Sequence, residues 1–367
     1  MTVPKKALAF LVILFVIILA AHHNSPPSSL SNETLGKVAE IEGEVEEIRN
    51  FTFKQLPDVI VVNREWALSE FSSQANLEEL KMWEDIYKMT LLVPPSYNYT
   101  RTAKGARASW IAATVGNKMY IIEENFVNTG ETAYRVIAHE LTHVLQKQYF
   151  DPKYPETLDG RLAITSLIEG DADLVADMYC GRHNITINKI TTLPLEDPPM
   201  AINFFPYVYG DKFVRFLYEK GGWTLVNFAY KAPPLSTEQV IHPQKYLFYE
   251  KPKEVYVDVP GGYKIIHEDR MGEFYIYLLI TSHLGEERAS KAADGWEGDD
   301  LILAENYTHE ILLWKTLWES EDDAREFYGA MKEIIKKTHE EYPYFVNVKI
   351  DIARNEVLIE SSKILRK

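Results

Sequence analysis

Apolar residues recur every three or four positions in two segments that lie on either side of a loop rich in proline and glycine. The first segment begins near Gly130-Glu131-Thr132, ends at about Tyr149 and has apolar residues at Ala133, Val136, Ile137, Leu141, Val144 and Leu145. The second runs from about Leu162 to Cys180. This spacing gathers the apolar side chains on one face of a helix, so two amphipathic helices are predicted.

Runs rich in β-forming residues come before these helices. Residues 60–62 predict a strand, and residues 109–115 and 118–122 predict a hairpin that turns at Gly116-Asn117. Between them a helix is expected from about Arg64, with apolar positions at Leu68, Phe71, Leu77, Leu80, Trp83 and Ile86. Further helices are predicted at residues 204–219, 223–230 and 237–242, after a proline-rich break.

From about residue 262 onward, predicted helices alternate with predicted strands. The helices are at residues 271–283 and 324–337, and the strands are at 301–304, 309–318, 345–352 and 357–360. The chain has 367 residues, of which 46% are hydrophobic, so it is large enough to bury a substantial core. These patterns predict an α+β fold in two lobes.

The first fifty residues precede the predicted main domain. Residues 22–50 are interpreted as a polar linker followed by a short acidic helix, whose apolar stripe is Leu35, Val38, Ile41, Val45 and Ile48. Two heptads are too few to indicate a coiled coil, so a helix lying against the domain is favoured over a dimerising stalk. The main domain is expected at residues 51–367, with lobes at 51–190 and 191–367.

Residues 1–21 contain Lys5-Lys6 and then fifteen uncharged, mostly apolar residues. This run spans about 22 Å as a helix, which is intermediate between a signal-peptide core and a membrane anchor. Both alternatives place the rest of the chain outside the cell, either secreted or tethered to the outer face of the membrane. Five Asn-x-Ser/Thr triplets, which begin at Asn32, Asn50, Asn98, Asn184 and Asn306, fit an exported glycoprotein.

The net charge and the cysteine content of the chain argue against a nucleic-acid-binding protein and against a disulfide-stabilised one. The 39 basic and 54 acidic residues give a net charge of -15, which argues against a nucleic-acid partner because such partners need clustered positive charge. The single cysteine, Cys180, rules out an intrachain disulfide. An acidic run at residues 296–300 fits no EF-hand loop, so it is interpreted as a turn with surface acids and not as a calcium site.

The first predicted helix carries His139-Glu140-Leu141-Thr142-His143. Residues four apart on a helix share one face, so both imidazoles can reach one Zn²⁺ while Glu140 lies beside its water. On the second helix, Glu169 and Asp173 are again four apart. Glu169 is the predicted third ligand, and Asp173 is the predicted acceptor for a ligand imidazole.

This combination resembles the gluzincin metallopeptidases, which are thermolysin-like in their active-site helices and carry His-Glu-x-x-His followed by Glu-x-x-x-Asp. The wider run at residues 138–150 is similar to a family of exported bacterial and archaeal metallopeptidases, and the resemblance covers about residues 60–320. It implies a two-lobed zincin-like fold and a peptide or protein substrate that pairs with the edge of the strand at 118–122. The sequence departs from thermolysin because it shows no recognisable long propeptide and no obvious calcium-loop pattern, so the resemblance does not extend to latency, and calcium beside the zinc is unsupported.

The predicted chemistry is hydrolysis of a peptide bond, with Glu140 as general base. The oxyanion needs another donor, for which His242 is the first candidate, with Tyr209 or Tyr207 next. A capped or core-packed His242 fits the sequence equally well. Two other functions remain open: a catalytically silent binding protein stabilised by zinc, and a membrane-tethered interaction module. The enzyme is favoured because Glu140 is present and three protein ligands leave the fourth zinc position open.

Overall fold

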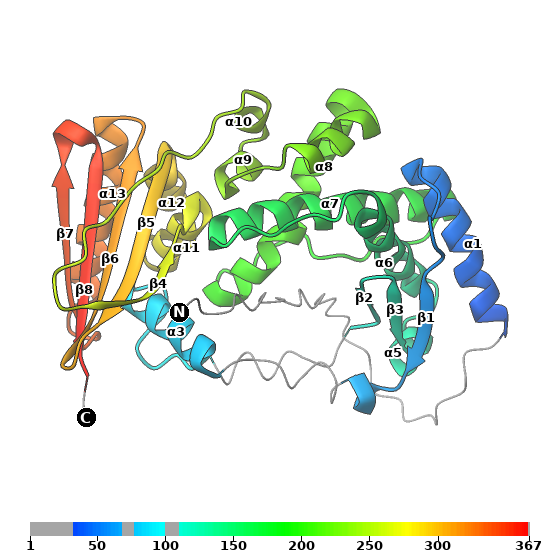
Figure 1. Ribbon diagram of the computed structural model, residues 1–367, viewed down its shortest axis with the longest axis horizontal. Coiled ribbons are helices and arrows are strands. Elements are labelled where there is room, and N and C mark those ends of the chain that lie inside the picture. Colours follow the sequence, from blue (N-terminus) through cyan, green and yellow to red (C-terminus); the bar gives the residue numbers. More distant parts are fainter. Residues whose placement is uncertain (1–31, 68–76, 100–109, 366–367) are drawn as a thin grey trace, which may run out of the picture.

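The computed structural model describes residues 32–67, 77–99 and 110–365. A three-stranded sheet lies at one end of the molecule, a five-stranded sheet lies at the other, and long helices connect them (Figure 1). The predicted α+β class is confirmed. The apolar segment and the linker up to residue 31 lie outside the described residues. Within the described ranges, no helix is both long enough and apolar enough to span a membrane.

The elements of the first part of the chain agree closely with the sequence pattern. They are α1 (Asn32–Arg49), β1 (Asp58–Val62), α3 (Leu77–Met89), β2 (Ala112–Val115), β3 (Lys118–Ile122), α5 (Glu123–Thr129), α6 (Thr132–Tyr149) and α7 (Leu158–His183). The two predicted amphipathic helices are α6 and α7, and the predicted hairpin is β2–β3. Positions 68 and 71 of the helix expected from Arg64 lie outside the described residues. The seven-residue helix α5 is too short to produce a recognisable period.

The small sheet has the strand order β1-β3-β2. β1 is parallel to β3, with Val59 opposite Met119, and β2 is antiparallel to β3, with Ala113 opposite Tyr120. β3 is therefore the central strand and has neighbours on both sides. The expectation of a free edge at residues 118–122 is wrong, because the parallel pairing of β1 covers it. Of these described strands, β2 is the edge strand that packs on α6.

Helix α1 lies against the domain, as predicted. Val38, Ile41, Val45 and Ile48 are buried, and they belong to the same apolar cluster as Leu141 of α6. Leu35, the first residue of the stripe, is exposed. Because burial of an aliphatic side chain contributes about 1.5–3 kcal/mol, these four residues hold α1 firmly on the helices that carry the candidate site.

The second part of the chain begins with a long kinked helix. Its elements are α8 (Pro198–Lys231), α9 (Thr237–Ile241), α10 (Pro243–Leu247), β4 (Lys264–Asp269), α11 (Gly272–Leu284), α12 (Glu286–Ala293), β5 (Trp296–Glu305), β6 (His309–Trp318), α13 (Glu321–Thr338), β7 (Phe345–Asp351), η1 (Ile352–Arg354) and β8 (Glu356–Ile364). Two predicted helices, 204–219 and 223–230, are the two arms of α8. The kink lies at Gly221 and Gly222, where Gly222 has a φ of 59°.

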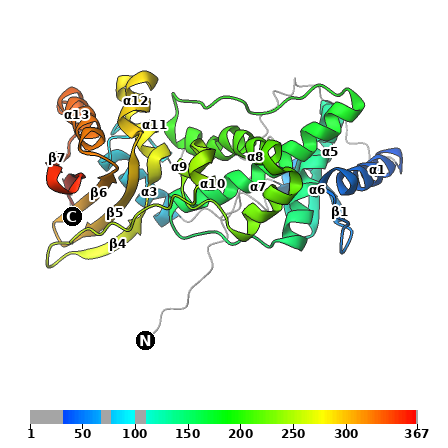
Figure 2. The ribbon, with the colours of Figure 1, turned by 90° about the horizontal axis from the view of Figure 1, so that it is seen from above.

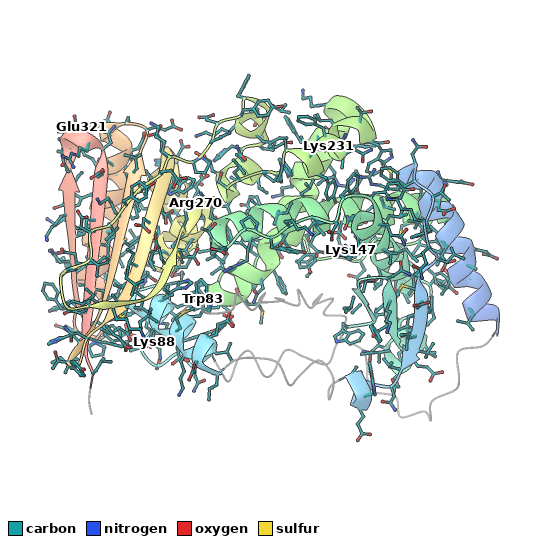
Figure 3. All side chains as sticks on the ribbon, viewed as in Figure 1. Trp83, Lys88, Lys147, Lys231, Arg270 and Glu321 are labelled. Carbon is teal, nitrogen blue, oxygen red and sulfur yellow. The ribbon has the colours of Figure 1, made fainter. Side chains whose placement is uncertain are left out.

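The C-terminal sheet has the order β4-β5-β6-β8-β7 and carries helices on one face (Figures 1 and 2). Phe327 of α13 packs against Trp314 and Trp318 of β6. On the other face, Val257 and Val259 of the preceding loop pack against Ile302 and neighbouring residues of β5 and β6. Arg270, labelled in Figure 3, joins this part to α7, because its Nε donates to Asp159 Oδ2 at 2.9 Å.

Asp299 corrects the interpretation of residues 296–300 as a turn with surface acids. These residues begin β5, and Asp299 is buried. Its carboxylate accepts hydrogen bonds from four N–H donors: the backbone N–H groups of Met271 and Gly272, and the indole N–H groups of Trp296 and Trp314, at 2.8 to 3.1 Å. The acid therefore satisfies buried donors where α11 begins, and its oxygens are engaged with N–H groups.

Replacing Asp299 with Asn is expected to destabilise the protein. The amide keeps one acceptor oxygen and presents an NH₂ group to N–H donors, so at least one buried donor loses its partner, at about 1–3 kcal/mol for each such group. Urea denaturation followed by tryptophan fluorescence measures the loss. Asp258→Asn, at an exposed position, is the matched control. Equal unfolding midpoints for the two variants contradict this role of Asp299.

Candidate metal centre

Helix α6 presents His139 and His143 on the same face. Its other face packs into the apolar cluster through residues such as Val136, Leu141 and Val144. Four residues separate the histidines, so their rings lie one turn apart, with centroids 4.7 Å apart and planes nearly perpendicular. His139 is almost completely buried, and the His143 side chain is 17% exposed. The site is therefore open to solvent on the side of His143.

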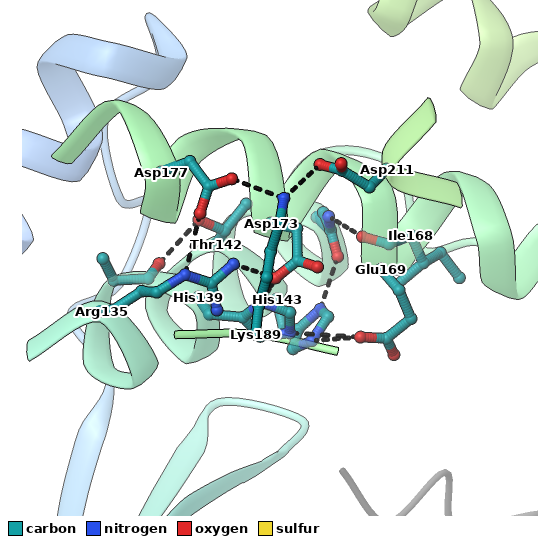
Figure 4. Close-up of polar contacts among 12 residues, drawn as sticks. Arg135, His139, Thr142, His143, Ile168, Glu169, Asp173, Asp177, Lys189 and Asp211 are labelled. Atoms are coloured by element: carbon teal, nitrogen blue, oxygen red, sulfur yellow. Dashed lines mark hydrogen bonds and ion pairs between the residues drawn. The ribbon is translucent and has the colours of Figure 1, made fainter. Parts of the chain in front are cut away.

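Glu169 of α7 completes a group of three metal-ligating side chains. Its Oε2 lies 3.2 Å from His139 Nε2 and 3.5 Å from His143 Nε2 (Figure 4). One ligand atom from each residue lies within 4.8 Å of the other two. The structure thus brings together the three predicted ligands in a group that could hold a metal ion. The donor set of two imidazole nitrogens and one carboxylate oxygen matches that of catalytic zinc sites.

The pKa values of these groups reflect strong mutual attraction. Burial opposes the charged form of each, but hydrogen bonds to Asp173 and Glu169 raise the pKa of His139 to about 10. Burial likewise disfavours ionised Glu169, yet the positive charge at His143 and the hydrogen bond from His139 lower the pKa of Glu169 to about 2. Glu169 is therefore a buried, ionised carboxylate whose negative charge is balanced by the neighbouring histidines.

Asp173 supports His139 from behind. Its Oδ1 lies 3.0 Å from His139 Nδ1, so the predicted contact between Asp173 and a ligand imidazole is present. Arg135, one turn before His139, donates from Nη2 to Asp173 and from Nε to Asp177. Lys189 in turn bridges Asp177 and Asp211. Figure 4 shows this chain of alternating charges, which fixes the carboxylate that orients His139.

Gln146 supports His143 and was missed at the sequence level. Its Oε1 lies 2.8 Å from His143 Nδ1. The sequence did contain a signal for this contact, because Gln146 follows His143 by three residues and so shares its helical face. In the structure Gln146 is buried. A neutral amide therefore orients one imidazole and a carboxylate orients the other.

Glu140 lies between the two histidines in sequence and is buried. Burial raises its pKa above the ordinary value, although the positive charges of His143 and His139 act in the opposite direction. Thr114 of the edge strand β2 donates its hydroxyl to the Glu140 backbone oxygen at 3.1 Å, which ties β2 to α6. Oε1 of Glu140 has no hydrogen-bond partner among the residues that the structure describes. One carboxylate oxygen is thus left for a ligand.

The three candidates for the oxyanion donor lie in different surroundings. His242 Nε2 lies 3.0 Å from Glu273 Oε1, and the Tyr209 ring packs beside Phe205 and Phe274. These contacts are with α8 and α11, so neither residue is joined to the metal-ligand group in the described part of the chain. Their role stays a prediction.

Tyr207 is the candidate beside the ligands. Burial raises the pKa of its hydroxyl well above the ordinary value, and the negative charges of Glu169 and Glu140 raise it further. It therefore stays protonated. Within the described ranges its buried hydroxyl has no hydrogen-bond partner.

Two glycines set the position of α8, which carries Tyr207. A Cβ on Gly170 would lie 2.1 Å from the backbone oxygen of Gly210, and a Cβ on Gly210 would lie 2.3 Å from that of Ser166. Gly170 and Gly210 therefore let the backbones of α7 and α8 approach each other closely.

Comparisons with known proteins cover parts of the chain. Residues 99–149 match the eCIS core domain, and residues 263–356 match a domain of unknown function, DUF8575. Each match covers less than half of the chain. A search of the curated proteins gives no match. A solved structure described as a "putative hydrolase with a novel fold", from Chloroflexus aurantiacus, is similar with 17% identity, a TM-score of 0.41 and coverage of 61% of this chain and 92% of that chain.

Replacing Gly170 with Ala is expected to lower the free energy of unfolding by about 1–3 kcal/mol, because the added methyl group meets the α8 backbone. Gly181→Ala is the matched control on the same helix. A Cβ at Gly181 meets nothing within 4 Å, so this change is expected to stabilise the helix by up to about 1 kcal/mol. Thermal unfolding monitored by circular dichroism compares the two. Stabilisation by both substitutions is the result that contradicts the close approach.

Proposed function

We propose that this protein is a zinc-dependent metallopeptidase of gluzincin type. The observation that carries the proposal is the buried Glu140 carboxylate, one oxygen of which has no partner among the described residues, next to the His139, His143 and Glu169 group. Three protein ligands leave one position of a tetrahedral ion open, as in catalytic zinc sites. A purely structural zinc site normally has four protein ligands and needs no carboxylate with a free oxygen beside them.

The residues present fit zinc better than calcium. Two imidazole nitrogens favour zinc, whereas calcium takes six to eight oxygen ligands. The buried Oε1 of Glu140 and the buried Tyr207 hydroxyl, both without partners among the described residues, fit a site that takes a further polar ligand. His139, His143 and Glu169 would hold the ion. Asp173 and Gln146 would keep the two imidazoles oriented toward it.

In this proposal, a zinc ion held by His139, His143 and Glu169 would supply an acidified water and polarise the scissile carbonyl. Glu140 would accept the proton of the attacking water on Oε1 and later deliver it to the leaving amine. Burial raises the pKa of Glu140, which makes the carboxylate a stronger base than an exposed glutamate and its protonated form available as an acid. Asp173 keeps a proton on His139 Nδ1, so Nε2 presents its lone pair to the site.

Tyr207 is our candidate for the second oxyanion donor, in place of His242 and Tyr209. Burial of its hydroxyl raises its pKa, and the negative charges of Glu169 and Glu140 add to that rise. A neutral phenol whose O–H has no acceptor among the described residues can donate to the oxygen that becomes negative when the carbonyl is attacked. The Gly170–Gly210 contact supports this position by holding α8 close to α7.

An extended peptide is the substrate class that the site suits. β2 is the edge strand beside α6, and the Thr114 hydroxyl binds the Glu140 backbone oxygen. A peptide that pairs with β2 would therefore pass along α6, the helix that carries His139, Glu140 and His143. We also propose that the domain acts outside the cell, secreted or tethered by residues 1–21, and that it has no nucleic-acid partner, given the net charge of -15.

Replacing Glu140 with Gln tests the proposed base. We expect zinc content to be unchanged and hydrolysis of a mixed peptide library to fall by about 10² to 10⁴-fold, because the amide cannot accept the proton. Glu156→Gln, at an exposed position, is the control that retains activity. Zinc binding without hydrolysis in all three proteins contradicts the enzyme and favours a zinc-stabilised binding protein. Absence of zinc contradicts the metal site itself.

Replacing Tyr207 with Phe distinguishes the oxyanion candidates. Loss of one donor is expected to lower kcat by about 10² to 10³-fold with little effect on KM or zinc content. Tyr209→Phe removes a tyrosine hydroxyl at a position two residues further along the chain, and it is expected to leave kcat unchanged. The same result is expected for His242→Gln. A large loss of kcat in His242→Gln with normal Tyr207→Phe kinetics would restore His242 to the first place.

A further inference from the structure

Arg49 is the last residue of α1, in the segment that the sequence assigned to a linker outside the catalytic region. Its guanidinium is buried and forms two hydrogen bonds with the buried Asp171 carboxylate, from Nε at 2.8 Å and from Nη2 at 3.2 Å. The guanidinium also lies 4.4 Å from the centroid of the Trp223 ring. A planar cation that is both bidentate and stacked has one well-defined orientation, and so does its carboxylate.

The oriented Asp171 carboxylate determines how the Gln146 amide lies. Asp171 Oδ2 accepts from Gln146 Nε2 at 3.1 Å, and the backbone oxygen of Ile168 accepts from the same nitrogen at 2.9 Å. Both N–H groups of the amide therefore have acceptors. The nitrogen must face α7, which leaves Oε1 to face His143. Rotating the amide by 180° would set its oxygen against two acceptors.

The amide orientation in turn selects the tautomer of His143. Gln146 Oε1 can only accept, so the atom 2.8 Å away, His143 Nδ1, must carry a proton. In the neutral ring, Nε2 is then the nitrogen with the free lone pair. This is the atom that lies 3.5 Å from Glu169 Oε2, on the side where the three ligands meet.

We propose that Arg49 is a positioning residue for the metal centre, which acts through Asp171 and Gln146 to hold His143 in the tautomer that binds metal through Nε2. Without Arg49, the buried carboxylate of Asp171 would lack its cation and its bidentate support. One of the two acceptors of the Gln146 amide would no longer be fixed, and the Ile168 backbone oxygen alone would hold its nitrogen, so that both tautomers of His143 would become populated. The helix next to the N-terminal segment is thus part of the metal centre.

The inference depends on the metal site of the proposed function and not on peptide hydrolysis, so its experiment measures binding and tautomer. Zinc affinity is measured by competition with a chelator for Arg49→Met, Gln146→Ala and the double variant. We expect each single change to weaken zinc binding by about 10 to 100-fold, and the double variant to bind as weakly as Gln146→Ala alone. An unchanged affinity in Arg49→Met, or losses that multiply in the double variant, would overturn the proposal.

Ring ¹⁵N chemical shifts of zinc-free protein provide the second measurement, at a pH where His143 is neutral. His143 is assigned from the signal that disappears in His143→Gln. The parent protein is expected to show only the Nδ1-protonated form, and Arg49→Met a mixture. A single unchanged tautomer in Arg49→Met overturns the proposal. This measurement decides the matter even if the parent binds no zinc, the result that would overturn the proposed function.

Ile41→Ala is the matched control for loss of α1 packing. Ile41 is fully buried on α1 but is remote from the contacts of Arg49, so its truncation is expected to lower the unfolding midpoint and leave tautomer and affinity unchanged. Equal losses of zinc affinity in Ile41→Ala and Arg49→Met show a merely structural effect and overturn the proposal. If Arg49→Met does not fold, Arg49→Lys keeps the charge without the bidentate geometry and is expected to show a mixed tautomer, with an unmixed one overturning the proposal.

Discussion

The burial of acidic side chains along α7 is the constraint on which the rest of the structure depends. Five carboxylates of this helix are buried, and a buried charge is tolerated only when it is paired. Their partners come from separate regions: Arg270 pairs with Asp159, the two histidines of α6 with Glu169, Arg49 with Asp171, and Arg135 with Asp173 and Asp177. A helix of 26 residues is about 39 Å long, so these ion pairs connect both ends of the molecule to the same helix, α7.

The sequence predicted those features that a local pattern determines. His139, Glu140 and His143 could be placed because the helical period around them is regular, and the spacing of Glu169 and Asp173 repeats that of the histidines. The ligands, Asp173 and the packing of α1 follow from the same rule, since residues that share a helical face meet the same neighbours. The α+β class followed from the order of the periodic segments.

Features that depend on contacts between distant segments were not predictable in this way. Asp299 resembles a surface acid in the sequence, and only the fold brings four N–H donors to it. The position of β3 at the centre of the sheet depends on β1, which is parallel to it and about sixty residues away in the chain. Arg49 looks like an ordinary helix-terminal cation, a favourable position on its own, until α7 presents Asp171 to it. In each case the missing information was the partner and not the residue.

The pairing of α7 also sets the charge of the candidate metal centre. Arg49 neutralises Asp171 and Arg135 neutralises Asp173, so within the described site Glu169 and Glu140 are the carboxylates without an Arg or Lys partner. Their two negative charges equal the charge of one divalent cation. In the proposed mechanism, uptake of a proton by Glu140 would remove one negative charge from the carboxylates, and the site would then favour a negative oxygen on the substrate. In the same mechanism, Tyr207 would add an O–H dipole without a charge, and would therefore stabilise that oxygen without weakening Glu140 as a base.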